Sequence, residues 1–228
     1  MKTSRILASF SLAAALVCSA GESVAPGEAV VLPDLAFPLQ LLHRGVTSGE
    51  VHVMLKVGPD MRLKDALVTA YTHKAFADAT LAALAQGTFH PQRIDGQPVT
   101  TLVPLIVRFE VNGLLVVERF ANSETELRAG DFAYQPCEAA RLDRPLQILA
   151  APSPGCLQGV RGQVIVEYYV DESGRVRMPE IVEAENAVLA GLSLQAVEQW
   201  QFTPPSCKGR PVLVRVRQAF VFAPEKAS

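Results

Sequence analysis

Histidine and serine are the residue types in this sequence whose spacing could support catalysis. The four histidines include no pair at i and i+4 and no His-Glu-x-x-His motif, so they indicate neither zinc ligation nor general-base catalysis: His43, His52, His73 and His90. The segment Gly191-Leu192-Ser193-Leu194-Gln195 begins like a nucleophile elbow but lacks the closing glycine. It also falls on a predicted helix, so we expect Ser193 to be an ordinary surface residue. No glycine-rich phosphate loop follows a predicted strand, and we predict no catalytic site, no cofactor and no enzyme.

The cysteines are the remaining candidates for chemistry. They stand at Cys18, Cys137, Cys156 and Cys207, and no two have the C-x-x-C spacing of a zinc site, so we predict no metal. If the first twenty residues are removed on export, three cysteines remain, which allow one disulfide and leave one thiol over. Cys156 and Cys207 are favoured as partners because both fall in the second half of the chain, but the pairing stays open.

The first twenty residues have the features of a secretory signal peptide. Lys2 and Arg5 give a positive start, Ile6 to Val17 form a short apolar stretch, and Cys18-Ser19-Ala20 supplies small residues for cleavage before Gly21. A membrane-spanning helix needs ~20 apolar residues, so we expect export rather than a membrane span. Two alternatives stay open: an uncleaved N-terminus that serves as an anchor, and a lipid attached to Cys18.

Composition places the rest of the chain among globular proteins. Of the 228 residues, 49% are apolar and 19% are charged, which is enough apolar material for two small buried cores. The formal net charge is −2 and the basic residues form no cluster. Nucleic-acid binding is therefore not predicted, because phosphate neutralisation needs a clustered basic surface.

An internal repeat organises these residues. Gly49 to Val57 aligns with Gly162 to Val170, and the alignment continues without a gap to Phe109 and Phe222. Residues that match at this constant offset of 113 include Leu81 with Leu194, Gln86 with Gln199, Phe89 with Phe202, Pro91 with Pro204 and Gly96 with Gly209. A shared hydrophobic rhythm alone would not keep glycine and proline in register across strand, helix and turn, so we infer a duplication.

Each copy predicts two strands, a helix and a third strand. In the second copy, alternating apolar residues from Val164 to Val170 indicate a half-buried strand, Asp171 to Gly174 a turn, and Arg175 to Val182 a returning strand. Apolar residues at helical spacing follow, at Leu189, Leu192, Ala196, Val197 and Trp200, and a long strand runs from Val212 to Phe222. The first copy repeats this order and ends with a strand from Val99 to Phe109. The predicted fold class is α+β, two tandem modules with one small antiparallel sheet each.

The domain boundaries follow from this repeat. We expect a signal peptide at 1–20, a first module at 21–111, a connector at 112–145 and a second module at 146–228. The apolar stretch Leu114 to Phe120 in the connector either adds a strand or packs between the modules. Arg175 and its counterpart Arg62 follow the hairpin turn, where they are either solvated surface residues or ligands for a partner carboxylate.

The second copy resembles the C-terminal domain of TonB-type energy transducers. The resemblance lies in the spacing Gly162-x-Val164-x-Val166-x-Tyr168-x-Val170-Asp171, in Gly174-x-Val176, in Ala196-Val197-x-x-Trp200-x-Phe202-x-Pro204 and in Gly209-x-Pro211-Val212. The first copy resembles the family more weakly, since Gly87 stands where Trp200 stands, although Phe37-Pro38 is similar to the family's aromatic-proline segment. We expect Trp200 in the core and Gly174 in the turn.

The resemblance implies a periplasmic protein that binds the TonB box of an outer-membrane receptor by β-strand addition, in which an extended peptide joins an exposed sheet edge. By position, the binding edge would be the last strand of the second copy: Val212, Leu213, Val214, Arg215, Val216, Arg217, Gln218, Phe220 and Phe222. Arg215 and Arg217 would limit indiscriminate pairing at this edge.

Departures from the family leave a second hypothesis open. The sequence has no convincing membrane anchor and no proline-rich spacer across the periplasm. The alternative is a non-transducing scaffold of the cell envelope, whose sheet edges pair with each other, with another envelope protein, or with a second copy in a homo-oligomer.

Overall fold

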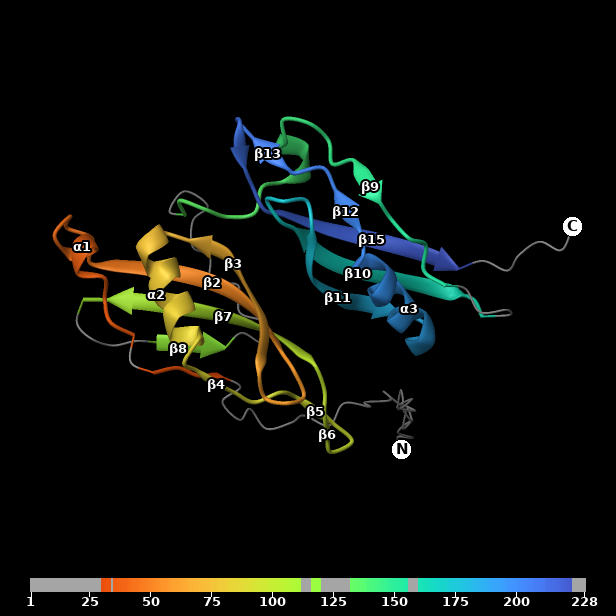
Figure 1. The fold of residues 1–228 in the computed structure, drawn as a ribbon, viewed down its shortest axis with the longest axis horizontal. Helices are drawn as coiled ribbons and strands as arrows, with labels where there is room; N and C mark the ends of the chain where they lie inside the picture. Colours follow the sequence, from red (N-terminus) through yellow and green to blue (C-terminus); the bar gives the residue numbers. More distant parts are fainter. Residues whose placement is uncertain (1–29, 34, 112–115, 120–131, 156–159, 223–228) are drawn as a thin grey trace, which may run out of the picture.

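The computed structural model describes residues 30–33, 35–111, 116–119, 132–155 and 160–222. Within this part the chain forms two α+β modules, each with an antiparallel sheet and one long helix (Figure 1). The predicted fold class and the tandem repeat are thereby confirmed. The predicted signal peptide and Cys156 lie outside the described residues.

The first module is built on a four-stranded sheet. Its elements are β1 (Val30–Val31), α1 (Leu39–Leu42), β2 (Ser48–Val57), β3 (Leu63–Tyr71), α2 (Lys74–Leu84), β4 (Thr88–Phe89), β5 (Arg93–Ile94), β6 (Gln97–Pro98), β7 (Thr101–Glu110) and β8 (Val116–Arg119). The sheet has the order β3-β2-β7-β8, and every pair is antiparallel. β8 comes from the predicted connector, within the apolar stretch that the sequence left as either a strand or a packing segment.

The second module is built on a three-stranded sheet. Its elements are η1 (Ala139–Arg141), β9 (Ile148–Ala150), β10 (Gly162–Val170), β11 (Val176–Ala184), α3 (Ala187–Val197), β12 (Gln201–Phe202), β13 (Ser206–Cys207), β14 (Arg210–Pro211) and β15 (Val214–Phe222). The sheet has the order β11-β10-β15, separate from the sheet of the first module. Short pairs lie outside both sheets: β1 with β4, and β9 with β12.

The two sheets share one hydrogen-bond register. Gly49 of β2 pairs with Phe109 of β7, and Gly162 of β10 pairs with Phe222 of β15. Both hairpins also carry a register shift at the same place, between His52 and Val53 in the first module and between Ile165 and Val166 in the second. The repeat therefore extends to backbone pairing and includes an irregularity that a hydrophobic pattern does not specify.

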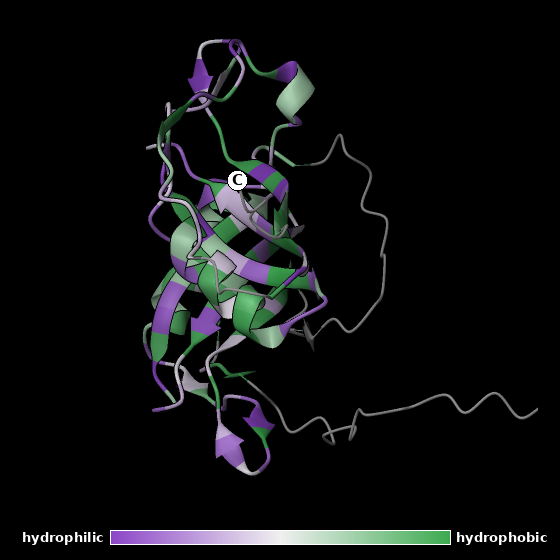
Figure 2. Cartoon of the chain, turned by 90° about the vertical axis from the view of Figure 1, so that its right-hand side faces the viewer, coloured by the Kyte–Doolittle hydropathy of each residue, from purple (hydrophilic) through white to green (hydrophobic). Residues whose placement is uncertain are grey.

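Alternation along the central strands places one apolar face against each helix. In β2 the helix-facing residues are Val51, Val53, Leu55 and Val57, and in β10 they are Val164, Val166, Tyr168 and Val170; all are buried. They pack with Phe76 and Leu84 in the first core and with Leu189 and Val197 in the second. Figure 2 shows the hydrophobic residues gathered in the sheets and helices, while the hairpins at the two ends of the view are more hydrophilic.

The following local expectations differ from the structure. The helix α3 ends at Val197, so Trp200 follows the helix instead of lying on it. The last strand begins at Val214, so Val212 and Leu213 precede it, and the returning strand β11 runs from Val176 to Ala184. The expectation for Ser193 was wrong. Its side chain is fully buried, because it lies on the same helix face as Leu189 and Val197, at i+4 spacing to each.

Ser193 offers a test of core packing. Its buried hydroxyl has no hydrogen-bond partner, whereas the matching Thr80 of α2 is equally buried and donates to the Phe76 carbonyl at 2.9 Å. We expect Ser193→Ala to raise the free energy of unfolding by about 1 kcal/mol, because it removes an unpaired buried hydroxyl. Thr80→Ala, the matched control, should lower it by about 1–2 kcal/mol, because a satisfied hydroxyl and a packed methyl are lost. Urea unfolding measures both, and a loss of stability in Ser193→Ala would contradict this reading.

Candidate functional site

The outer edge of β15 lies where the sequence predicted a binding edge. Its inner edge pairs with β10 over the whole strand, from Val214 to Phe222. On the outer edge, Cys137 forms a parallel bridge with Val214 and donates its N–H to the Leu213 carbonyl at 2.7 Å. Beyond Val214, no strand in the described part of the chain pairs with this edge.

The predicted edge residues fall into three groups. Val212 and Leu213 precede the strand; the N–H of Val212 donates to the Pro205 carbonyl at 3.1 Å, and Leu213 is buried between the modules. Arg215 and Arg217 are exposed on the face away from α3, together with Ala219 and Val221, which were not in the predicted set. Residues on the helix side are only half-buried, apart from the buried Val214: Val216, Gln218, Phe220 and Phe222.

Two side-chain contacts hold the exposed edge strand in place. Arg215 forms an ion pair with Glu167 on the neighbouring strand β10. Burial works to lower the pKa of Arg215, but the hydrogen bond to Glu167 and the nearby acidic groups together outweigh it and leave that pKa raised, so the guanidinium stays charged. On the helix side, the ring of Phe220 contacts Trp200 at a centroid distance of 5.5 Å.

The equivalent edge of the first module is closed by the chain itself. β8 pairs with β7 through Leu105–Arg119, Ile106–Glu118, Val107–Val117 and Arg108–Val116. The β7 residues that match the half-buried set of β15 are each at most 3% exposed: Val103, Leu105, Val107 and Phe109. The same strand therefore occurs in both modules. In the first it has a neighbouring strand and a buried apolar row. In the second, the described residues place a neighbour only at Val214, and the rest of the row is half-buried.

The motif residues behind β15 form the support for this edge. Trp200 is 8% exposed and donates from Nε1 to the Pro152 carbonyl at 3.0 Å, and Phe202 and Val164 are buried in the same core. Gly174 has a φ of 83°, and a Cβ there would overlap the carbonyl oxygen of Phe202. The N–H of Phe202 donates to the Gly174 carbonyl at 2.8 Å. The other motif positions are peripheral: Gly162 opens β10, Gly209 turns between β13 and β14, and Pro204 and Pro211 are exposed.

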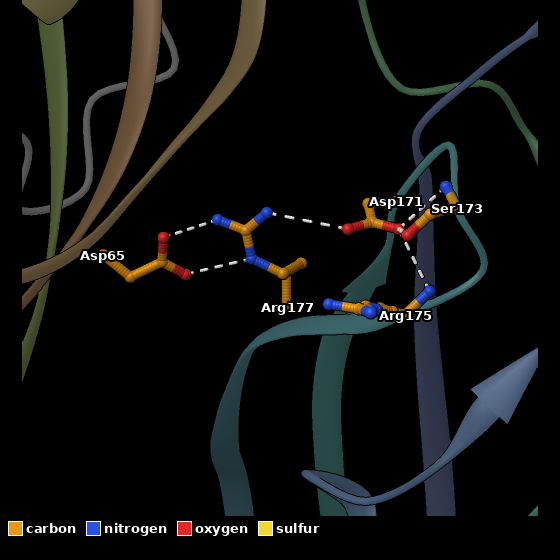
Figure 3. A network of polar contacts seen from close by, with 5 residues as sticks. All are labelled: Asp65, Asp171, Ser173, Arg175 and Arg177. Carbon is orange, nitrogen blue, oxygen red and sulfur yellow. Dashed lines mark hydrogen bonds and ion pairs between the residues drawn. The ribbon is translucent and has the colours of Figure 1, made fainter.

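A polar network connects the hairpin turn of the second module to the first module (Figure 3). One Asp171 oxygen, Oδ1, accepts hydrogen bonds from the N–H groups of Ser173 and Arg175 at 2.9 and 3.0 Å, which closes the turn. Arg177 extends from the same hairpin to Asp65 on β3, with Nε to Oδ2 at 3.0 Å and an NH2 contact to Oδ1 at 2.5 Å. Arg175 and Arg62 are both exposed. Whether they are solvated or bind a partner carboxylate stays a prediction.

An apolar cluster completes the contact between the modules. Leu67, Met178 and Leu213 are buried together, with Met54 and Tyr169 packed against them. Lys56 and Glu198 form a further ion pair across the modules at 2.9 Å. The sequence signal for this interface was present in apolar residues on the strand faces that point away from the helices, such as Met54 and Met178.

Glu50 is the one charged residue among the described positions that is buried, at 5% exposure. Its carboxylate accepts from Arg108 Nε at 3.1 Å and contacts His52 Nε2 at 2.5 Å, so its charge is paired with residues of β7 and β2.

Within the described residues, no group of three or more His, Cys, Asp or Glu side chains could hold a metal ion. In the same residues, no helix is long and apolar enough to cross a membrane.

Comparisons with known proteins agree with the sequence pattern. The family model described as Gram-negative bacterial TonB protein C-terminal matches residues 33–111 and 156–224. Among solved structures, the NMR structure of the Pseudomonas aeruginosa TonB C-terminal domain matches with 22% identity and a TM-score of 0.32, over 36% of this chain and 90% of that one. Comparison with curated proteins gave no match.

The contact of Arg177 with Asp65 can be measured by a double-mutant cycle. We expect Arg177→Met and Asp65→Asn to show a coupling energy of about 1 kcal/mol, because the pair is bidentate and partly buried. The matched control is Lys64→Met with Asp60→Asn, an exposed pair within the first module that should show a coupling close to zero. Equal coupling in both cycles, measured by urea unfolding, would mean that Arg177 does not join the modules.

The turn carboxylate Asp171 predicts a pH effect. Burial works to raise its pKa, but the hydrogen bonds from Ser173 and Arg175 and the charge of Arg177 outweigh it, so the folded pKa is lowered. This stabilisation is fully present above the unfolded pKa of about 3.9 and is lost as the pH falls through the folded value. Asp171→Asn should therefore cost up to about 1 kcal/mol at pH 6, allowing for solvent screening, and less at pH 3. A cost that does not shrink at pH 3 in urea unfolding would refute this.

Proposed function

The chain belongs to the family of Gram-negative bacterial TonB protein C-terminal domains, and from this premise we propose that its second module binds TonB-box peptides of outer-membrane receptors by β-strand addition. The peptide joins the sheet at the outer edge of β15 in the periplasm. The protein serves an energy-coupled outer-membrane transport system as an interaction module and carries out no catalysis itself.

The contrast between the two modules is the observation that carries this proposal. Where β8 pairs with the edge, the helix-side row of β7 is at most 3% exposed. On β15, where no strand among the described residues pairs with the outer edge, Val216, Phe220 and Phe222 are half-buried. An added strand supplies main-chain hydrogen bonds to unpaired N–H and C=O groups and brings side chains over this apolar row. Both effects favour an extended peptide at β15.

β8 also supplies a template for the register of the bound peptide. It pairs antiparallel with Leu105 to Arg108, whose counterparts in the repeat are Gln218 to Val221. The start of β15 is already occupied by Cys137. The peptide is therefore expected to pair with the second half of β15, antiparallel to it.

A titration followed by NMR tests this proposal. The labelled chain without residues 1–20 is titrated with a TonB-box peptide, and chemical-shift changes are expected along Gln218 to Val221. Signals of Leu105 to Arg108 on β7 should stay in place, because β8 covers that edge. Shift changes at β7, or none anywhere at millimolar peptide, would refute binding at β15.

Two adjacent proline variants separate binding from folding. Neighbouring residues of a strand direct their N–H groups to opposite edges, so one of Gln218→Pro and Ala219→Pro loses a hydrogen bond to β10 and the other loses only an outward N–H. The variant that keeps the wild-type melting temperature should bind the peptide about tenfold more weakly, the cost of one main-chain hydrogen bond. Unchanged affinity in this variant would contradict strand addition.

The alternative function is a non-transducing scaffold of the cell envelope. The first module favours it, since its edge is filled by a strand of the same chain. In that case β15 pairs with β15 of a second copy, and light scattering detects a dimer. A dimer that the TonB-box peptide does not disrupt supports the scaffold, whereas a monomer that binds the peptide supports the transport function.

A further inference from the structure

A short part of the connector is fastened across the start of β15. At one end, the N–H of Cys137 donates to the Leu213 carbonyl at 2.7 Å. At the other, the N–H of Asp143 donates to the Ser206 carbonyl at 2.8 Å, and the Asp143 carboxylate accepts from the Ser206 hydroxyl at 2.9 Å. The backbone N–H groups of Lys208 and Gly209 add two more hydrogen bonds to this carboxylate, at 2.7 and 2.8 Å. Residues 137–143, called the strap below, are therefore held at one end to the start of β15 and at the other end to the β13–β14 hairpin.

This arrangement places two thiols together. Cys207 lies in β13, one residue from Ser206, to which the strap is bonded, and Cys137 is bonded to Leu213, two residues after β14. The Cys137 thiol itself donates to the Glu138 carbonyl at 3.5 Å, and the neighbouring Cys207 helps to raise the pKa of Cys137. Both are free thiols in this structure, and both are half-buried. The strap and the hairpin are each fixed by their own hydrogen bonds, so the segments that carry the two thiols are held next to each other.

We propose that Cys137 and Cys207 are a disulfide site that locks the strap to the second module when the protein reaches an oxidising compartment. The third cysteine of the mature chain, Cys156, then keeps its thiol. The sequence favoured Cys156 with Cys207, a pairing that stays a prediction because Cys156 lies outside the described residues; we propose instead a partner in the connector, seventy positions before Cys207 in the chain.

The oxidation is a thiol–disulfide exchange. One thiolate attacks a disulfide of the oxidant, such as oxidised glutathione or a thiol–disulfide oxidoreductase, and releases one thiol of that oxidant. The second cysteine then attacks the mixed disulfide, which forms the Cys137–Cys207 bond and releases the other thiol. In total, two protein thiols give up two electrons and two protons to the oxidant. Burial, together with the neighbouring Cys207, raises the pKa of Cys137, so the exchange should accelerate as the pH rises.

The disulfide would set the length of the edge that is open to a partner. The strap covers the edge at Val214. A disulfide from Cys137 to Cys207 in the β13–β14 hairpin would keep the strap from separating from this edge. Strand addition is then confined to the residues after Val214. This consequence rests on the proposed function, but the existence of the disulfide does not.

The site is tested by oxidation of the chain without residues 1–20, which has three thiols at Cys137, Cys156 and Cys207. After incubation with oxidised glutathione, we expect a thiol titration to fall from three to one. Mass spectrometry of a non-reduced digest should show the peptide of Cys137 joined to that of Cys207. A crosslink that contains Cys156, or three thiols that persist at high oxidised glutathione, would overturn the proposal.

Matched serine variants separate the disulfide from folding. Cys156→Ser should still oxidise and gain about 5–15 °C in melting temperature on oxidation, because a closed loop of this length constrains the unfolded chain. Cys137→Ser should gain nothing on oxidation, and its melting temperature should stay close to that of reduced Cys156→Ser. Equal gains in both variants would refute the site. None of these readouts involves the peptide, so failure here and failure of peptide binding are distinguishable.

Discussion

The main-chain groups at a sheet edge need hydrogen-bond partners, and this requirement shapes both modules. An edge strand presents a row of N–H and C=O groups that pair with another strand, with water or with a partner chain. The first module meets the requirement internally, because β8 returns along β7. The apolar row of β7 is buried in the core of this module, against which Leu32, Leu35 and Phe37 also pack. In the second module the described chain covers only the start of β15, and the remainder of the strand faces outward with a half-buried apolar row.

The contacts between the two modules lie close to the start of the β15 edge. Leu213, directly before β15, is buried with Leu67 and Met178 between the modules, and Arg177 bonds to Asp65 across the same boundary. The docking thus uses the approach to β15 and the strand β11 at the opposite edge of the same sheet, while Arg217 and Val221 farther along β15 stay exposed. The first module thereby holds the second in place at a point that leaves its outer edge accessible.

The sequence predicted the elements that depend on local pattern and missed those that depend on distant contacts. Alternation in β2 and β10, the glycine of the hairpin turn and the constant repeat offset were enough for the fold. Ser193 was predicted on the surface because serine is usually exposed, but its i+4 spacing to Leu189 and Val197 places it on the buried face of α3. The pairing of Arg177 with Asp65 joins residues 112 positions apart, and nothing local specifies it. For the same reason, Cys207 next to Cys137 follows from the fold and not from spacing.

The register shift that both hairpins share indicates which backbone feature is older than the duplication. A bulge at His52/Val53 and again at Ile165/Val166 is a backbone feature, and two copies would rarely arrive at it separately. It belonged to the single ancestral unit before that unit was copied in tandem. The edge closures differ between the copies, so at least one of them changed after the duplication. The two outer edges have therefore diverged while the bulged hairpin stayed the same.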